Sequence, residues 1–268
     1  MISVICVYND RGILEDFLLK GLKDQTVDFE LILVDNTKGM FSSAAEALNH
    51  GANNAKGKYL LFVHQDIDLS WNKWLEESEK ILDSLADLGI AGVAGRSESE
   101  LGTLSNIEHG IPPSGVRGIN GRGVIRPEIV QTLDECLVII PRTIFDMAKF
   151  DAKTCDGWHL YAVDYCLSLE RLGIKAYVLP MYVYHASAAN SMSESYFAAL
   201  GRVLKKHKDH YGPIHTTVGN WNARHPLSIN RLNYQIFIFK YYSKHLHSCI
   251  IFKRALKNKL RYVLKKRS

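Results

Sequence analysis

Short apolar runs, polar turns and helical patterns alternate along the first third of the chain. Three of the apolar runs are short and rich in aliphatic residues, as buried strands are: 2–7, 29–34 and 59–63. A helical pattern follows each run, over 13–22, over 44–55 after the capping residue Ser42 or Ser43, and over 71–85. Short strands that alternate with helices predict a parallel sheet with crossovers, so we expect an α/β fold.

Polar side chains stand at the end of each of these strands. They are Tyr8, Asn9 and Asp10 after the first, Asp35 and Asn36 after the second, and Asp66 and Asp68 after the third. Ligands of parallel sheets bind at the carboxyl ends of the strands. An acid after a strand can also cap the next helix or lie in solvent. Three polar groups on one edge nevertheless favour a binding site.

The second half of the chain continues the α/β pattern after one long interruption. A strand over 90–94 leads into a glycine-rich connection that includes 114–127. Its glycines do not form a dinucleotide-binding fingerprint, because no strand precedes them and no helix follows. We expect a mobile loop there, since long loops in compact domains are often functional lids. Further strands and helices are expected at 137–140, 143–148, 162–172 (ending at Gly173), 176–179 and 182–184.

The composition fits one large globular domain, or one domain with an appendage. The chain has 268 residues, of which 47% are hydrophobic and 23% are charged. Its 5 cysteines include no CxxC pair and are odd in number, which argues against a disulfide framework or a structural zinc site and indicates a reducing compartment. We find no secretory leader and no apolar stretch long enough to span a membrane. The protein is therefore expected in the cytoplasm, or peripherally on the inner face of the cell membrane.

The net charge of +5 conceals two regions of opposite charge. Asp209 is the last acidic residue, and 12 of the 33 Lys and Arg residues follow it, so residues 1–209 hold 21 basic and 28 acidic residues, a balance of −7. A basic amphipathic helix over 250–268 predicts peripheral contact with a membrane surface. A helix that packs on the rest of the protein and a nucleic-acid patch are the alternatives. The apolar face of this expected helix contains Leu256, Leu260, Val263 and Leu264.

Six segments occur in an order and spacing that resemble a known family. They are ISVICVYND, LILVDN, NHGANNAKGKYLLFVHQDID, LDECLVIIPRTIF, GWHLYAVDYCLSLERLGIKAYVLP and VYHAS, and they cover roughly residues 1–190. The chain resembles the inverting GT-A glycosyltransferases of the large bacterial family two, which build polysaccharides. The resemblance implies a Rossmann-like, mostly parallel sheet with flanking helices. It also implies a catalytic domain over 1–210, with the nucleotide sugar bound by 1–95 and the acceptor by 96–210, and it leaves 211–268 as a basic helical extension.

The resemblance assigns a metal and a donor site to the strand ends. Asp66 and Asp68 occupy the Asp-x-Asp position that holds Mn²⁺ or Mg²⁺ against the diphosphate of the donor, and His185 matches a further metal ligand. His64 stands where an acid is often found, which leaves the source of the first ligand open. For the donor itself, the resemblance assigns contacts to Tyr8, Asn9, Asp35 and Asp66.

Inverting transfer also needs a base that takes the proton of the acceptor hydroxyl. The resemblance makes Asp164 this base, at the start of the helix over 162–172, where the helix dipole favours the anion. Ala162 stands where many relatives have another acid, so Asp156 and Glu135 are the alternatives. On the acceptor side of the site, the resemblance implies Glu135, Trp158 and His159.

The sequence thus predicts a metal-dependent transferase that uses a nucleoside-diphosphate sugar, with a UDP-sugar favoured. The acceptor would be a glycan or a lipid-linked glycan in surface polysaccharide (capsule) synthesis. A catalytically inactive partner subunit is one alternative, because of Ala162. A nucleotidyltransferase would need a glycine-rich basic loop after the first strand, where only Arg11 and Gly12 stand. A nucleic-acid-binding protein would leave the strand-end acids unexplained, so no nucleic acid is expected as a partner.

Overall fold

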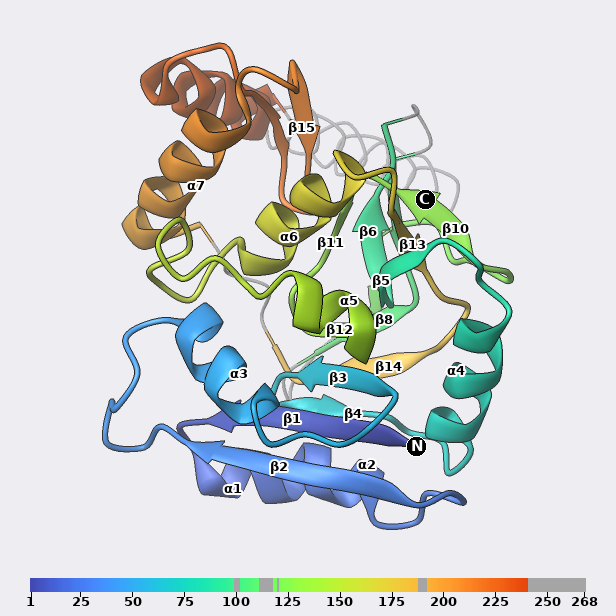
Figure 1. Cartoon of the computed structure of the whole chain (residues 1–268). Coiled ribbons are helices and arrows are strands. Elements are labelled where there is room, and N and C mark those ends of the chain that lie inside the picture. Colours follow the sequence, from blue (N-terminus) through green and yellow to red (C-terminus); the bar gives the residue numbers. More distant parts are fainter. Residues whose placement is uncertain (99–101, 111–117, 120, 188–191, 241–268) are drawn as a thin grey trace, which may run out of the picture. The chain divides into compact units, whose positions relative to one another are not determined.

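The computed structural model describes residues 1–98, 102–110, 118–119, 121–187 and 192–240 (Figure 1). The chain divides into two compact units, Met1–Arg224 and His225–Ser268. In the second unit the described residues form one helix, over 227–240. In the described part of the chain, no helix is long and apolar enough to cross a membrane.

A seven-stranded sheet runs through the first unit, in the order β10-β13-β5-β12-β3-β1-β2. Five of its strands run in one direction and two, β12 and β10, run against them. The predicted α/β class with a mostly parallel sheet is therefore confirmed. The parallel strands are β1 (Ile2–Tyr8), β2 (Phe29–Asp35), β3 (Tyr59–Val63), β5 (Leu88–Gly92) and β13 (Lys175–Val178), and the others are β12 (Leu137–Pro141) and β10 (Glu128–Val130).

The strands are continuous apolar runs because helices cover the sheet on both faces. All residues of β3 are buried, as expected where neither face meets water. Ser43 caps α3 by accepting a hydrogen bond from the backbone N–H of Glu46. Gly51 lets α3 approach β1, since a Cβ there would lie 2.9 Å from side-chain atoms of Ile5 and Val34. The helices are α1 (Arg11–Leu14), the π-helical turn η1 (Glu15–Leu19), α2 (Lys20–Leu22), α3 (Ala44–Ala52), α4 (Trp74–Asp83), α5 (Arg142–Met147), α6 (Tyr161–Glu170) and α7 (Glu194–His207).

Three smaller sheets complete the unit, and one of them connects distant parts of the chain. Its order is β4-β14-β8-β9, and it pairs Ile67 of β4 with His185 of β14. The segment after β3 is thereby held against a strand from late in the chain. The strands of these sheets are β4 (Ile67–Asp68), β14 (Val183–His185), β8 (Ile107–His109) and β9 (Gly118–Ile119), then β11 (Thr132–Leu133), β6 (Ala94–Arg96) and β7 (Thr103–Ser105), then β15 (Pro213–His215) and β16 (Asn220–Asn222).

The structure differs from the sequence-based expectation in the connection after residue 94 and in the end of the first unit. The connection predicted as one long loop is interrupted by the short strands β6 to β11, while residues 111–117 and 120 within it lie outside the described residues. The first unit extends to Arg224, not to 210, because the β15–β16 hairpin belongs to it. That hairpin is attached to β11 and the residue before it: the hydroxyl of Thr132 donates to the carbonyl of His215, and the backbone N–H of His215 donates to Oε1 of Gln131 (2.7 Å). The amphipathic helix expected over 250–268 lies outside the described residues.

Candidate functional site

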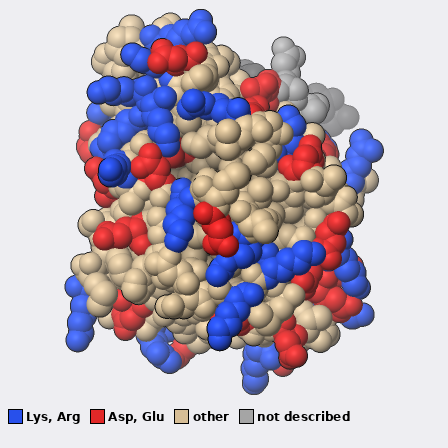
Figure 2. All heavy atoms as spheres, in the orientation of Figure 1, with Lys and Arg blue, Asp and Glu red and all other residues tan. Residues whose placement is uncertain are grey.

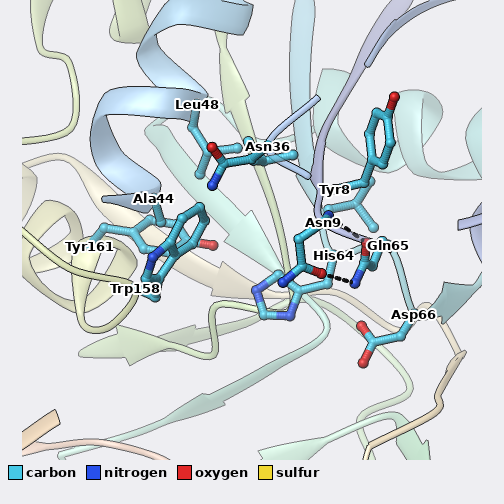
Figure 3. Close-up of a pocket in the computed structure, with 12 residues that line it drawn as sticks. Tyr8, Asn9, Asn36, Ala44, Leu48, His64, Gln65, Asp66, Trp158 and Tyr161 are labelled. Atoms are coloured by element: carbon cyan, nitrogen blue, oxygen red, sulfur yellow. Dashed lines mark hydrogen bonds between the residues drawn. The ribbon is translucent and has the colours of Figure 1, made fainter. Parts of the chain in front are cut away.

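A cavity of about 320 Å³ opens at the carboxyl ends of β1, β2 and β3, at the edge where the sequence predicts a site. The end of each strand contributes to its lining, and so do α3 and the residues before α6. Figure 3 shows Trp158 and Tyr161 on the side of the cavity opposite Tyr8 and Gln65. Leu48 and Ala44 of α3 form an apolar part of the wall, while Asn9, His64 and Asp66 supply polar atoms.

His64, Asp66 and His185 form the one group of potential metal ligands that the described residues contain. Each offers one ligand atom, and these atoms lie within 4.8 Å of one another. Nε2 of His185 is 3.3 Å from Oδ2 of Asp66. The contact follows from the pairing of β4 with β14, which a hydrogen bond from the backbone N–H of Ala186 to the carbonyl of Asp66 (2.9 Å) continues.

The electrostatics of this group suit a cation. Burial raises the pKa of Asp66, but the hydrogen bond and charge of His185 outweigh burial and leave that pKa below its usual value. Burial lowers the pKa of His64, so its imidazole is neutral, which is the form that binds metals. His109 lies beside His185, with ring centroids 5.3 Å apart, and the Nδ1 atoms of both rings are buried without a hydrogen-bond partner.

Asp68, the second acid of the predicted motif, is not part of this group. Its Oδ1 accepts a hydrogen bond from the backbone N–H of Ser70 (2.7 Å) and lies against Gly21 of α2, where a Cβ would meet it at 2.8 Å. Ser70 has a positive φ of 57°, a turn that this hydrogen bond stabilises. Asp68 therefore faces α2, and His64 takes the place beside Asp66 that the sequence had left open.

The end of β1 is tied to the end of β3 by Gln65. Its Oε1 accepts hydrogen bonds from the backbone N–H groups of Asn9 and Asp10 (both 3.0 Å), and its Nε2 donates to Oδ1 of Asn9 (2.7 Å). The two bonds between Gln65 and Asn9 are drawn in Figure 3, and together with the bond from Asp10 they hold Gln65 against the end of β1. Sequence reasoning overlooked Gln65, since a glutamine at a strand end carries no distinctive pattern.

Of the predicted donor contacts, Tyr8 and Asn9 line the cavity and Asp35 does not. The carboxylate of Asp35 accepts hydrogen bonds from the hydroxyl (2.7 Å) and backbone N–H (2.8 Å) of Thr37, which lower its pKa. Asn36 lines the cavity instead, and its side chain holds the loop after β2 by two hydrogen bonds to the backbone of Phe41.

Asp164, the predicted base, is buried and fully paired. Its side chain is 2% exposed, with Oδ2 2.7 Å from Nζ of Lys206 and Oδ1 2.8 Å from Nε2 of His207. Burial lowers the pKa of Lys206, but the carboxylates of Asp164 and Asp151 outweigh it and raise that pKa. Figure 2 shows Lys and Arg side chains gathered in the region of α7, whose last turn contributes Lys206 and His207. The group joins α6 to α7 and leaves Asp164 no free oxygen for a substrate.

Glu135 and Asp156, the alternatives to Asp164, differ sharply in surroundings. Asp156 is 59% exposed and pairs with Arg202 of α7. Glu135 precedes β12, and the backbone N–H groups of Leu160, Tyr161 and Ala162 at the start of α6 face its carboxylate. Burial, then the charge of Asp134, raise the pKa of Glu135 to about 8, in spite of these N–H groups. Its Oε1 is buried and has no hydrogen-bond partner within the described part of the chain.

The two other acceptor-side residues, Trp158 and His159, precede α6 and differ in exposure. Trp158 is 44% exposed and lines the cavity, so its ring is available to a ligand. His159 is half-buried against Tyr196 of α7 and Ser193, and it does not line the cavity. Leu160 has a φ of 68°, an unusual conformation for a leucine, and this residue turns the chain into α6 beside Glu135.

Comparison with known proteins agrees with this architecture. Residues 4–109 match the sequence model of a family described as "Glycosyltransferase like family". A solved structure of GalNAc-T7 with UDP, GalNAc and Mn²⁺ has a similar fold, with a TM-score of 0.56 and 14% identity over 79% of this chain and 48% of the other. The chain has a GT-A fold. The predicted resemblance is thereby confirmed, although this GT-A chain spans only about half the length of GalNAc-T7.

Two further likenesses are weaker or less informative. The mannosyltransferase PcManGT of Pyrobaculum calidifontis, solved with GDP-Man and Mn²⁺, has a TM-score of 0.48 and 14% identity over 76% of this chain and 61% of the other. A Fuscovulum blasticum protein named "ATP synthase subunits region ORF 6" is 26% identical over 197 residues, 70% of this chain and 76% of that protein. That name states a gene location and no activity.

Proposed function

We propose that the protein is a metal-dependent, inverting glycosyltransferase that uses a nucleoside-diphosphate sugar, with a UDP-sugar favoured. The observation that carries the proposal is the group of His64, Asp66 and His185 beside a cavity at the carboxyl ends of the parallel strands. Nucleotides bind at this edge in open α/β sheets. The family match over 4–109, which covers β1 to β3 and His64, supports the same assignment.

The three side chains fit a divalent metal ion. Their ligand atoms converge, the carboxylate of Asp66 is held ionised, and the His185 ring has a buried nitrogen without a partner. A divalent ion bound there would supply positive charge against the diphosphate leaving group. The residues around it orient the donor: Leu48 and Ala44 offer apolar surface to the nucleoside, while Asn36 and Asn9 offer hydrogen-bonding groups.

For the base we propose Glu135 in place of Asp164. Both oxygens of Asp164 are paired, one with Lys206 and one with His207, whereas Oε1 of Glu135 has no hydrogen-bond partner among the described residues. The carboxylate of Glu135 faces the backbone of Ala162, the position at which the resemblance places the missing acid. A carboxylate whose pKa is about 8 accepts a proton more strongly than an ordinary glutamate. Glu135 would therefore take the proton of an acceptor hydroxyl that approaches past Trp158.

The acceptor and the cellular role rest on the family resemblance and the basic C-terminal region. We propose a glycan or lipid-linked glycan acceptor in surface polysaccharide synthesis, with the protein held peripherally at the inner membrane face by residues 250–268. The 12 basic residues after Asp209 would attract an anionic surface. Removal of 250–268 should abolish sedimentation with anionic vesicles, and retained sedimentation would contradict this part of the proposal.

The transfer activity is tested by incubation with a panel of nucleoside-diphosphate sugars and Mn²⁺, with release of the nucleoside diphosphate as the measurement. We expect release from one donor of the panel, loss of release with EDTA, and its recovery with added Mn²⁺. Asp66→Asn should release the nucleoside diphosphate about 10³-fold more slowly, while Asp68→Asn should behave as the unaltered protein. No release from any donor, with or without glycan acceptors, would contradict the proposal and favour an inactive partner subunit.

A further inference from the structure

The ligand atoms at the candidate site are unusual in their proportion of nitrogen. Two of the three side chains, His64 and His185, are imidazoles, and Asp66 is the only carboxylate of the group. Asp68, which would have supplied a second carboxylate, faces α2 and bonds to the backbone of Ser70. The protein therefore offers one carboxylate and two imidazole rings where an Asp-x-Asp pair would offer two carboxylates.

From this ligand set we infer that the site selects its ion, binding Mn²⁺ or a similar transition-metal ion and discriminating against Mg²⁺ through His64. The inference rests on the proposed function for the location of the site. Mg²⁺ is a hard cation that prefers oxygen ligands and retains its water molecules. Imidazole nitrogen suits first-row transition ions, whose affinity for nitrogen rises along the series from Mn²⁺ to Cu²⁺. Replacing one carboxylate by an imidazole weakens the charge attraction for both ions. The imidazole restores binding only for the ion that accepts a nitrogen ligand.

The surroundings of the His64 ring leave it available for this role. Within the described residues its ring makes no hydrogen bond, while its backbone N–H donates to the carbonyl of Cys136 (2.9 Å) and its carbonyl accepts from the backbone N–H of Ile67 (3.4 Å). The ring lies 5.9 Å from that of His185, centroid to centroid, at an interplanar angle of 66°. Gln65 holds the neighbouring backbone against β1, which fixes the spacing of His64 and Asp66. His64 is half-buried and lines the cavity, so its ring nitrogens are open to a ligand.

The direct test measures ion binding in the absence of any donor. The chelator-treated full chain is titrated separately with MnCl₂ and MgCl₂ by calorimetry, for the unaltered protein, His64→Asp, Asp66→Asn and Asp68→Asn. We expect the unaltered protein to prefer Mn²⁺, and His64→Asp to narrow the ratio of the two dissociation constants by at least about tenfold, or about 1.4 kcal/mol. Asp66→Asn should bind neither ion, and Asp68→Asn should match the unaltered protein.

Pulsed electron paramagnetic resonance of the unaltered protein with Mn²⁺ gives a second measurement that needs no variant. Nitrogen couplings from directly bound imidazole are expected. The inference is overturned if these couplings are absent. It is also overturned if calorimetry finds equal affinity for the two ions, an unchanged ratio of dissociation constants in His64→Asp, or loss of Mn²⁺ binding in Asp68→Asn. Because no donor is present, selective Mn²⁺ binding can be found even if no sugar is transferred. Conversely, if Mg²⁺ and Mn²⁺ support donor turnover equally, the proposed transferase function stands and the inference of ion selectivity is overturned.

Discussion

Two groups of polar side chains in this protein each contain an acid that the sequence predicts to be functional. They differ in how many of their polar atoms have a partner. In the group that joins α6 to α7, each oxygen of Asp164 meets a nitrogen of Lys206 or His207. In the strand-end group, Asp66 meets His185 at 3.3 Å, Nδ1 of His185 is buried with no hydrogen-bond partner in the described structure, and the half-buried ring of His64 lines the cavity. A buried polar atom without a partner costs free energy, whereas a paired one stabilises the packing around it. The first group therefore fits a structural role, and the second fits a ligand.

The largest effect is expected from Asp66→Asn. The amide keeps the size of the side chain but removes the only carboxylate of the strand-end group, so turnover should fall by about 10³. Mn²⁺ binding should be lost with it, and the circular dichroism spectrum should stay the same. Asp68→Asn is the matched control, because an amide oxygen can still accept the hydrogen bond from Ser70. Equal losses of turnover and Mn²⁺ binding in the two variants would contradict the conclusion that Asp66 binds the metal ion and Asp68 does not.

Glu135→Gln should lower turnover by about 10² with little change in donor affinity, since the amide cannot accept a proton. Below about pH 8 the carboxyl of Glu135 is protonated, so turnover of the unaltered protein should rise with pH up to that value. A pH profile that rises near 4 and is flat from 5 to 9 would exclude Glu135 as the base.

The pH dependence of stability tests the raised pKa of Glu135 independently of turnover. Its pKa is about 8 in the folded protein, above the value of 4.5 for an unperturbed carboxyl. Between these values the unfolded chain loses the proton and the folded chain keeps it, so the unaltered protein loses stability as pH rises. Glu135→Gln has no such dependence, and its stability relative to the unaltered protein should increase from pH 5 to 8 in denaturant titrations. If the difference in free energy of unfolding between Glu135→Gln and the unaltered protein does not change with pH, the pKa of Glu135 is not raised.

Asp164→Asn should act on stability rather than on chemistry. It leaves Lys206 and the buried His207 without their shared carboxylate, and we expect a loss of about 3 kcal/mol in the free energy of unfolding. Turnover per folded molecule, measured well below the melting temperature, should remain. Asp156→Asn is the comparison: its ion pair with Arg202 is exposed, so its loss should be below about 1 kcal/mol. A 10²-fold loss of turnover in a folded Asp164→Asn would restore Asp164 as the base.

Trp158→Ala should give the smallest change. An exposed aromatic ring on the cavity wall offers a stacking surface, and its removal should weaken binding of donor or acceptor about tenfold, measured as KM or by calorimetry. Trp71 is similarly exposed but does not line the cavity, so Trp71→Ala should bind as the unaltered protein does. If both variants bind normally, Trp158 is not part of the site.

The sequence predicts the sheet and its ligand-binding edge well, because β1, β2 and β3 are clear apolar runs and α3 and α6 carry a helical pattern of apolar residues. The strands β6 to β11 were not foreseen, since elements of two or three residues are too short to show a period. The helix α7 was not predicted either. Its Lys206 and His207 decide the surroundings of Asp164, so the sequence offered no sign that this acid would be paired.

The strand-end residues show the same limit. Asp66 and Asp68 are equivalent in the sequence pattern, and only the pairing of β4 with β14 shows which of them meets His185. His64 was noticed as a departure from the family pattern, but its place beside Asp66 depends on contacts between distant segments. Local sequence therefore located the edge of the sheet, and tertiary pairing selected the residues that act there.

Crystals grown with MnCl₂ and UDP, measured at the manganese absorption edge, test the central claim most directly. The account predicts one anomalous difference peak within about 2.0–2.5 Å of ligand atoms of His64, Asp66 and His185, with Asp68 and Asp164 keeping their present hydrogen bonds. A peak coordinated by Asp68, or bound UDP with no manganese beside Asp66, would contradict it.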